Sequence, residues 1–290
     1  MCEFSIVTDS AADLPDELVR EMGVEVIPLR FTIDGQTYED HPDRRDMPIK
    51  EFYDRLRAGQ MGSTAAINVG DYHDALRPIL ESGRDVLVLA FSSGLSTTYQ
   101  SAVIAAEELR EEFPERTIAV VDTLCASLGE GLLVWHAVNL KKEGKSLEEV
   151  RDWVEAKKLN LIHWVAVDDL NHLKRGGRIS ATTAFVGGML SIKPIIHVDN
   201  EGKLINVGKV RGRMASLKSV ADKVLELAEP KQGQMIFISH SDCLEDAEVI
   251  GERLKAEGLA REVVYNHIGP VIGSHTGPGT VAVFGLGTER

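Results

Sequence analysis

Five serine and threonine hydroxyls lie between residues 92 and 98 in the uncharged stretch AFSSGLSTTYQS (90–101), which directly follows an apolar run. They belong to Ser92, Ser93, Ser96, Thr97 and Thr98. Hydroxyls and backbone N–H groups between a strand and a helix can hold a carboxylate or a phosphate without an adjacent cation. The same residues could instead supply a serine nucleophile or simply cap the following helix. Residues elsewhere in the chain must decide among anion binding, a serine nucleophile and helix capping.

A serine hydrolase is one alternative, because His275 could serve as the base for Ser96. Asp9 or Asp122 could orient that histidine and complete a Ser-His-Asp triad. The nucleophile elbow of such enzymes requires the pattern GxSxG, whereas residues 94–98 read GLSTT and match only the first three positions. Covalent catalysis is therefore a weaker hypothesis than anion binding.

The sequence motifs for nucleotide binding and metal binding are incomplete or absent in this chain. Residues 144–146 (GKS) resemble the end of a P-loop, but Asn139 stands where that motif requires a glycine. Residues 129–131 (GEG) lack the third glycine of a dinucleotide fingerprint. The nine histidines show no HxH or HExxH spacing, so no metal site is expected. Phosphate transfer through His275 or another histidine is a third alternative.

Two stretches of the second half could add to an anion site. Arg178 follows two glycines in LKRGGRIS (173–180), and a guanidinium is a good partner for carboxylate or phosphate oxygens. The stretch GPVIGSHTGPG (269–279) places four glycines around His275, which predicts a loop whose backbone can approach a ligand closely. The imidazole of His275 could donate a hydrogen bond to an oxyanion.

The first 160 residues alternate strand, polar loop and helix, which predicts a mainly parallel sheet covered by helices. The expected strands are 4–8, 24–33, 36–38, 85–91 and 117–121, and the expected helices are 14–22, 48–57, 71–81, 98–113, 127–142 and 146–157. We expect residues 62–70 to form a loop or a helix start. Because ligands bind outside the carboxyl ends of such strands, the loops TDS (8–10), SSGLSTT (92–98) and DTLCAS (122–127) should meet at one site.

Residues 161–290 read as a second, α+β domain. The expected strands are 160–167, 191–198, 203–210, 234–240, 261–266 and 280–286, and the expected helices are 169–175, 182–190, 214–228 and 244–257. The turn DNEG (199–202) predicts that two of these strands form a hairpin. The fold class is therefore α/β with two domains, 1–160 and 161–290, that pack closely together.

Composition restricts the possible partners. The chain has 290 residues, of which 43% are hydrophobic, and a net charge of −13, which argues against nucleic acid or an anionic membrane surface as the main partner. No apolar segment approaches the ~20 residues of a transmembrane helix, and the N-terminus lacks the features of a signal peptide. Three widely spaced cysteines form no CxxC pair. These features predict a cytoplasmic protein without stable membrane insertion.

The chain resembles the DegV family of bacterial fatty acid-binding proteins in five stretches that occur in the expected order. They are VTDSAADLP (7–15), FSSGLSTTYQSA (91–102), VVDTLCASLGEG (120–131), LKRGGRISATTAFVGGMLSIKPII (173–196) and SHTGPG (274–279). The resemblance implies a carrier, not an enzyme, that holds a long-chain fatty acid such as palmitate, stearate or oleate between two domains, with no cofactor. It also implies that a separate fatty acid kinase converts the bound acid into acyl-phosphate for phospholipid synthesis.

The resemblance also implies roles for individual residues. The residues expected to bind the carboxylate are Thr64, Ser96 and His275, with Ser63, Ser93 and Thr276 as additional headgroup residues. The residues expected to act with the kinase are Arg178, Arg211 and Asp40. The chain departs from the family where TSQP is replaced by 64–67 (TAAI) and LSGT by 95–98 (LSTT). The residue that corresponds to the carboxylate-binding threonine of the family is therefore Thr64 or its neighbour Ser63. The side chain of Thr97 should reshape the headgroup pocket.

Overall fold

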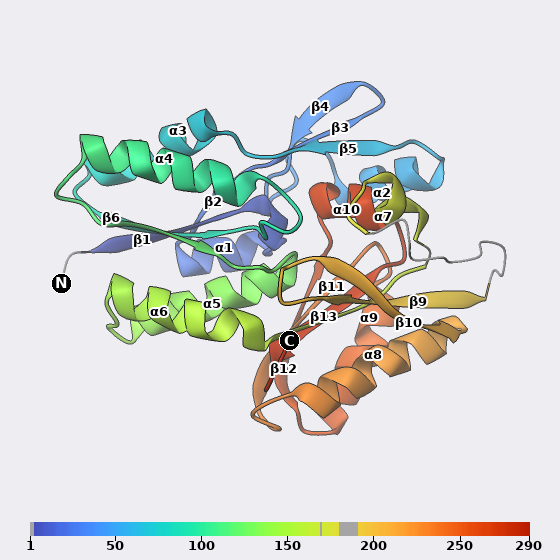
Figure 1. Ribbon diagram of the computed structural model, residues 1–290. Coiled ribbons are helices and arrows are strands. Elements are labelled where there is room, and N and C mark those ends of the chain that lie inside the picture. The colour runs from blue at the N-terminus through green and yellow to red at the C-terminus, as the bar shows by residue number, and fades with distance from the viewer. Residues whose placement is uncertain (1–2, 169, 180–190) are drawn as a thin grey trace.

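The computed structural model describes residues 3–168, 170–179 and 191–290, which form three sheets with covering helices (Figure 1). The four-stranded sheet is parallel and has the order β2-β1-β6-β7. Its strands are β1 (Phe4–Asp9), β2 (Glu25–Ile27), β6 (Asp85–Ala90) and β7 (Ile118–Asp122). Every residue of β1 and β6 is buried, as expected for parallel strands that are covered on both faces.

Helices cover the two faces of this parallel sheet (Figure 1). One face carries α3 (Val69–Glu81) and α4 (Thr98–Glu112), and the other carries α5 (Leu128–Lys142) and α6 (Leu147–Lys157). The short helices α1 (Asp16–Met22) and α2 (Ile49–Arg57) complete the first half. The predicted strand–loop–helix alternation is confirmed.

The predicted strand 24–33 was wrong, because the structure divides it into β2 and β3 (Arg30–Ile33). Pro28 lies between them and has no N–H with which to continue a ladder. Strand β3 instead pairs antiparallel with β4 (Gln36–Glu39) and β5 (Gly62–Ala65) to form a three-stranded sheet. The expectation of a loop or helix start from residue 62 was therefore also wrong, since β5 precedes α3.

The six-stranded sheet of the second half has the order β10-β9-β8-β13-β11-β12. Its strands are β8 (Leu161–Ala166), β9 (Ile192–Val198), β10 (Leu204–Arg211), β11 (Gln234–His240), β12 (Ala260–His267) and β13 (Val281–Leu286). Helices α8 (Arg213–Leu227) and α9 (Leu244–Ala256) pack on one face. The predicted β9–β10 hairpin is confirmed. The helix expected at 182–190 lies outside the described residues.

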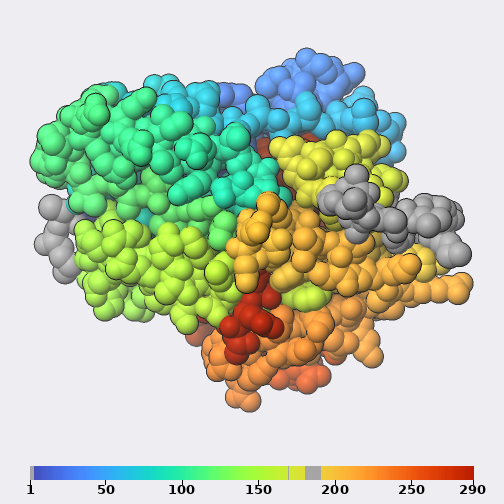
Figure 2. Space-filling model, viewed as in Figure 1, coloured from blue at the N-terminus to red at the C-terminus, as the bar shows by residue number. Residues whose placement is uncertain are grey.

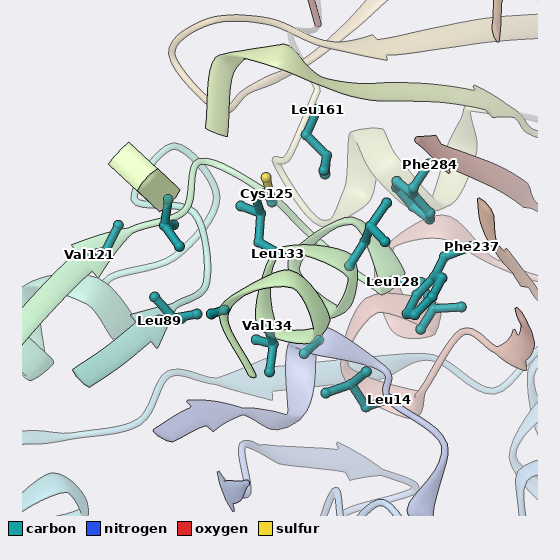
Figure 3. Close-up of a cluster of buried hydrophobic side chains, with 14 of the residues drawn as sticks. Leu14, Leu89, Val121, Cys125, Leu128, Leu133, Val134, Leu161, Phe237 and Phe284 are labelled. Carbon is teal, nitrogen blue, oxygen red and sulfur yellow. The ribbon is translucent and has the colours of Figure 1, made fainter. Parts of the chain in front are cut away.

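Helix α5 joins the two halves into one core. Its side chains Leu128 and Leu133 pack in a cluster that also holds Leu89 of the parallel sheet and Phe237 and Phe284 of the six-stranded sheet (Figure 3). Figure 2 shows the orange surface of the second half lying directly against the green surface of the first half. A mixed α/β fold with a parallel sheet and a second, sheet-rich unit is thus confirmed, whereas a division at residue 160 stays a prediction.

The glycine-rich stretch 269–279 is mainly a helix, so the predicted loop was wrong. Helix α10 (Pro270–Thr276) begins with a proline, which is favourable in a first turn, and ends at Gly277 with φ 74°. It packs beside β5, β3 and α2 of the first half, and beside the short helix α7 (Asn171–Arg175) (Figure 1). Within the described residues, no helix is long and apolar enough to cross a membrane.

Candidate ligand-binding site

A cavity of about 410 Å³ lies where the two halves meet. The six-stranded sheet supplies much of its apolar wall, through alternate residues that face the first half. These residues are Val165, Ile196, Val198, Leu204, Ala282 and Phe284. The first half adds Leu29, Phe91 and Leu95. The volume lies within the range of about 300–1,000 Å³ that is usual for small-molecule sites. These wall residues were not expected as ligand contacts from the sequence, although the alternation of residues along each strand could have indicated them.

Polar side chains line the same cavity beside this wall. Five of the predicted carboxylate and headgroup residues are among them: Thr64, Ser93, Ser96, His275 and Thr276. Thr64 ends up there because β5 carries it at the edge of the three-stranded sheet, and His275 because α10 packs on that strand. The structure thus brings together residues that are more than 200 positions apart in the chain.

Thr64 and His275 form the centre of the polar group. Thr64 Oγ1 lies 2.8 Å from His275 Nε2. Burial lowers the pKa of His275 to about 4, with a further contribution from the nearby positive charge of Arg178, so the imidazole is neutral at pH 7. His275 Nδ1 is buried without a hydrogen-bond partner among the described residues. If the ring hydrogen is on Nε2 and donates to Thr64 Oγ1, the hydroxyl hydrogen of Thr64 is free to donate to a bound anion.

The five hydroxyls of the 92–98 stretch divide into two groups. Ser93, Ser96 and Thr97 line the cavity, whereas Ser92 and Thr98 are fully buried elsewhere. Ser96 Oγ accepts a hydrogen bond from Thr98 N at 3.2 Å and lies 2.9 Å from Thr98 Oγ1. Ser96 therefore also supports the first turn of α4, so the capping and binding interpretations of this serine are compatible.

The other part of the stretch fastens the loop to the β9–β10 hairpin. Ser92 Oγ donates to Gly202 O at 2.9 Å. A Cβ at Gly94 would lie 2.5 Å from Glu201 O, so only glycine allows the hairpin turn to approach this closely. Since Val198 and Leu204 of that hairpin line the cavity, these two residues help to hold its wall in place.

The TDS loop does not reach the cavity, contrary to expectation. Asp9 is fully buried and accepts hydrogen bonds from Ala11 N and Phe91 N. Ser10 Oγ accepts one from Leu29 N at 2.9 Å. The polar groups of this loop are therefore used for internal connections, and only the other two hydroxyl-rich loops contribute to the cavity lining.

A second cleft of about 550 Å³ adjoins the polar group and shares Thr64, Arg178 and His275 with the cavity. It also contains Arg175 and the exposed Ser63, which does not line the main cavity. Arg178 is partly buried and donates to Leu95 O at 3.2 Å and to Gly176 O at 2.6 Å. The guanidinium is thus fixed at the boundary between the cavity and the cleft.

The other two residues expected to act with a kinase lie apart from both openings. Arg211 is exposed at the end of β10. Asp40 is 1% exposed and pairs with Arg44, and burial raises the pKa of this carboxylate. In this conformation Asp40 therefore cannot touch a protein partner directly.

The arrangement is not that of a hydrolase triad. Ser96 Oγ contacts Thr98, while His275 Nε2 contacts Thr64, and no hydrogen bond joins Ser96 to His275 in the described parts of the chain. Asp9 is engaged by two backbone N–H groups, and Asp122 Oδ1 accepts from Ser93 N and Leu124 N. Neither aspartate orients the imidazole, so the geometry gives covalent catalysis no support.

Proteins similar to this chain include structures that are described as binding fatty acids. Residues 3–287 match a family model described as "Uncharacterised protein, DegV family". A DegV domain-containing protein of Clostridium perfringens is 46% identical over all of this chain and 99% of its own length. A DegV family protein from Thermus thermophilus, described as binding fatty acid, has a TM-score of 0.88 at 34% identity, covering 98% of this chain and 99% of its own. A stearic acid-binding protein from Eubacterium ventriosum has a TM-score of 0.87 at 26% identity, covering 98% of each chain.

Proposed function

Because this chain belongs to the DegV family, we propose that it binds a long-chain fatty acid in the cavity between its two halves. The carboxylate would be held by Thr64, Ser96 and His275, with Ser93 and Thr276 nearby. The acyl chain would lie along the apolar wall formed by the six-stranded sheet. The observation that carries this proposal is that one cavity joins a neutral group of hydroxyls and imidazole to a continuous apolar lining.

The chemistry of the lining suits an amphipathic acid. Burial of an acyl chain contributes about 0.8 kcal/mol for each CH₂ group, so a chain such as that of palmitate offers ample binding free energy. The carboxylate needs hydrogen-bond donors once it leaves water, and the hydroxyls of Thr64 and Ser96 can donate. A neutral His275 would orient Thr64 without adding a charge. Arg178, at the boundary of the cavity, adds the positive potential that favours an anion.

We further propose that the protein is a carrier which presents the acid to a fatty acid kinase. The second cleft supports the proposed interaction with a kinase, because it adjoins the headgroup residues and contains Arg175 and Arg178. Guanidinium groups in this position could stabilise a phosphate that approaches the carboxylate. Arg211 would contribute to the same partner surface from β10. The protein itself would catalyse no step. The acyl-phosphate would form when a carboxylate oxygen attacks the terminal phosphorus of the nucleoside triphosphate held by the kinase, and the nucleoside diphosphate would leave.

A binding titration and a covalent labelling assay test this function. Titration with a fluorescent fatty acid, followed by displacement with palmitate, should give saturable binding of one acid per chain. A fluorophosphonate probe should leave Ser96 unlabelled, because no base among the described residues contacts its hydroxyl. Absence of saturable binding in protein stripped of lipid would contradict the carrier proposal, and labelling of Ser96 would revive the hydrolase alternative.

A further inference from the structure

Helix α10 comes from the second half of the sequence but is held by the first half. Its N-cap residue Gly269 donates its backbone N–H to Asp13 Oδ1 at 2.8 Å. Asn266, just before the helix, donates its side-chain amide to Asp13 O at 2.7 Å. Figure 1 shows α10 beside α2 and α7, next to β5 of the first half. The position of His275 near the end of α10 therefore depends on contacts made at the beginning of this helix.

A second buried carboxylate holds the same turn. Asp40 lies against the backbone N–H of Val271 and forms an ion pair with Arg44. Arg44 Nη2 also lies 3.9 Å from Asp13 Oδ1, so one guanidinium connects the two carboxylates. The side chains of Asp13 and Asp40 are both 0% exposed. Burial raises the pKa of both groups, that of Asp13 to about 7, which shows that keeping them here is energetically costly.

Tyr53 of α2 fixes the other side of this turn. Its hydroxyl donates to Ile268 O at 2.7 Å. A Cβ at Gly273 would lie 2.8 Å from Tyr53 Oη and 2.9 Å from Phe52, so the helix backbone packs directly on these rings. Val271 is buried in the apolar core of the first half. The first turn of α10 is thus restrained by hydrogen bonds, an ion pair and close packing.

This restraint reaches the headgroup residues over a short distance. Val271 and His275 are four residues apart, which is about 6 Å along a helix axis. A helix turn transmits a displacement of its first residues almost rigidly to the last. The contact of 2.8 Å between His275 Nε2 and Thr64 Oγ1 would not survive a shift of 1 Å, because hydrogen bonds weaken steeply beyond about 3.2 Å.

We propose that Asp13 and Asp40, connected by Arg44, are positioning residues that hold α10 so that His275 meets Thr64 at the headgroup end of the cavity. The consequence for ligand affinity rests on the proposed function, whereas the placement of His275 does not. The resemblance assigned Asp40 to work with a kinase. Its burial indicates that such an effect would pass through α10 and the headgroup, not through direct contact.

The test compares Asp40→Ala with Glu130→Gln, which changes an equally buried carboxyl group on α5 that contacts Thr8 instead of α10. NMR titration measures the pKa of the His275 ring, whose signals are assigned by comparison with His275→Gln. This pKa depends on the burial of the ring and on the nearby positive charge of Arg178. We expect the pKa of His275 to rise from about 4 toward its ordinary 6.5 in Asp40→Ala, as the ring moves toward solvent, and to stay low in Glu130→Gln. Palmitate should bind about ten-fold more weakly to Asp40→Ala only, the equivalent of losing one hydrogen bond to a charged group.

A milder variant protects the test against failure to fold. Tyr53→Phe removes the hydrogen bond to Ile268 O and the contact of 3.1 Å with Ser241 Oγ but keeps the ring, and it should raise the pKa of His275 by a smaller amount. An unchanged His275 titration in both Asp40→Ala and Tyr53→Phe would overturn the positioning role, even if both variants were less stable. If the parent protein binds no palmitate, the proposed function fails, and the His275 titration still decides the placement of α10.

Discussion

Thr64→Val isolates the role of the central hydroxyl, because valine keeps the shape of threonine and suits a β-strand equally well. The substitution removes Oγ1, which lies 2.8 Å from His275 Nε2 and, in our account, donates to the carboxylate of the fatty acid. The variant therefore loses one ligand contact and also leaves both ring nitrogens of His275 without a partner among the described residues.

The expected size of both effects follows from these contacts. A hydrogen bond to a charged group contributes about 1.5–3 kcal/mol, which corresponds to a dissociation constant roughly 10- to 100-fold higher. Loss of the partner of a buried polar atom costs about 1–3 kcal/mol of stability. Since Thr64 is only half-buried, we expect a loss near the lower end of that range in the free energy of unfolding of the empty protein.

The assay is displacement of a fluorescent fatty acid by palmitate, combined with equilibrium unfolding in urea. Thr32→Val is the matched control, because Thr32 lies on the adjacent strand of the same sheet and its Oγ1 contacts only the exposed Thr37 Oγ1, at 2.8 Å, in the described parts of the chain. Palmitate affinity of the control should stay within about two-fold of the parent, a difference too small to reflect a lost hydrogen bond. Equal affinities of Thr64→Val and Thr32→Val would refute the assignment of Thr64 to the headgroup.

Four further predictions concern other parts of the site. Ser96→Ala should weaken palmitate binding about ten-fold and reduce the free energy of unfolding by about 1 kcal/mol in urea, because Thr98 N loses its acceptor. Ala282→Phe should fill part of the cavity wall, so that the affinity ratio of stearate to laurate falls by about 200-fold if four CH₂ groups are excluded; an unchanged ratio would place the acyl chain elsewhere. Arg178→Ala should leave palmitate affinity within a few-fold of the parent but slow phosphorylation of the bound acid in a kinase-coupled assay, and equal rates would argue against the cleft as the meeting point. Burial raises the pKa of Asp13 to about 7 in the folded chain, so the folded state holds its proton more tightly, and this stabilisation is full below pH 4 and lost as the pH rises through 7. Asp13→Asn should therefore reduce the decline in unfolding free energy between pH 5 and 8 by about 2–3 kcal/mol, whereas identical slopes would contradict the raised pKa.

Local signals in the sequence were sufficient for much of the fold. The turn DNEG at 199–202 predicted the β9–β10 hairpin, and the apolar run 85–91 predicted a strand of a parallel sheet. Thr64, Ser96 and His275 were expected at one site from family resemblance, and the structure brings all three to one cavity. These features could be predicted because each depends on residue types within a few positions of one another or on a known motif.

Features that depend on distant contacts could not be predicted in this way. The glycines at 269 and 273 indicated a loop, yet they serve a helix that packs closely on Asp13 and on Tyr53. Ser92 and Ser96 looked alike in sequence, but Ser92 binds the hairpin turn and only Ser96 lines the cavity. The burial of Asp40 likewise could not be predicted, because it depends on the ion pair with Arg44 and on the packing of the first turn of α10.

The central claim is that the cavity holds a fatty acid, and the most direct test is mass spectrometry of the purified protein after denaturation. We predict the release of a fatty acid of about 14–18 carbons, whose apolar part the cavity wall can bury. The amount should approach one molecule per chain and should fall in Ala282→Phe. A protein that is purified empty, and that then fails to take up labelled palmitate or oleate, would contradict the account.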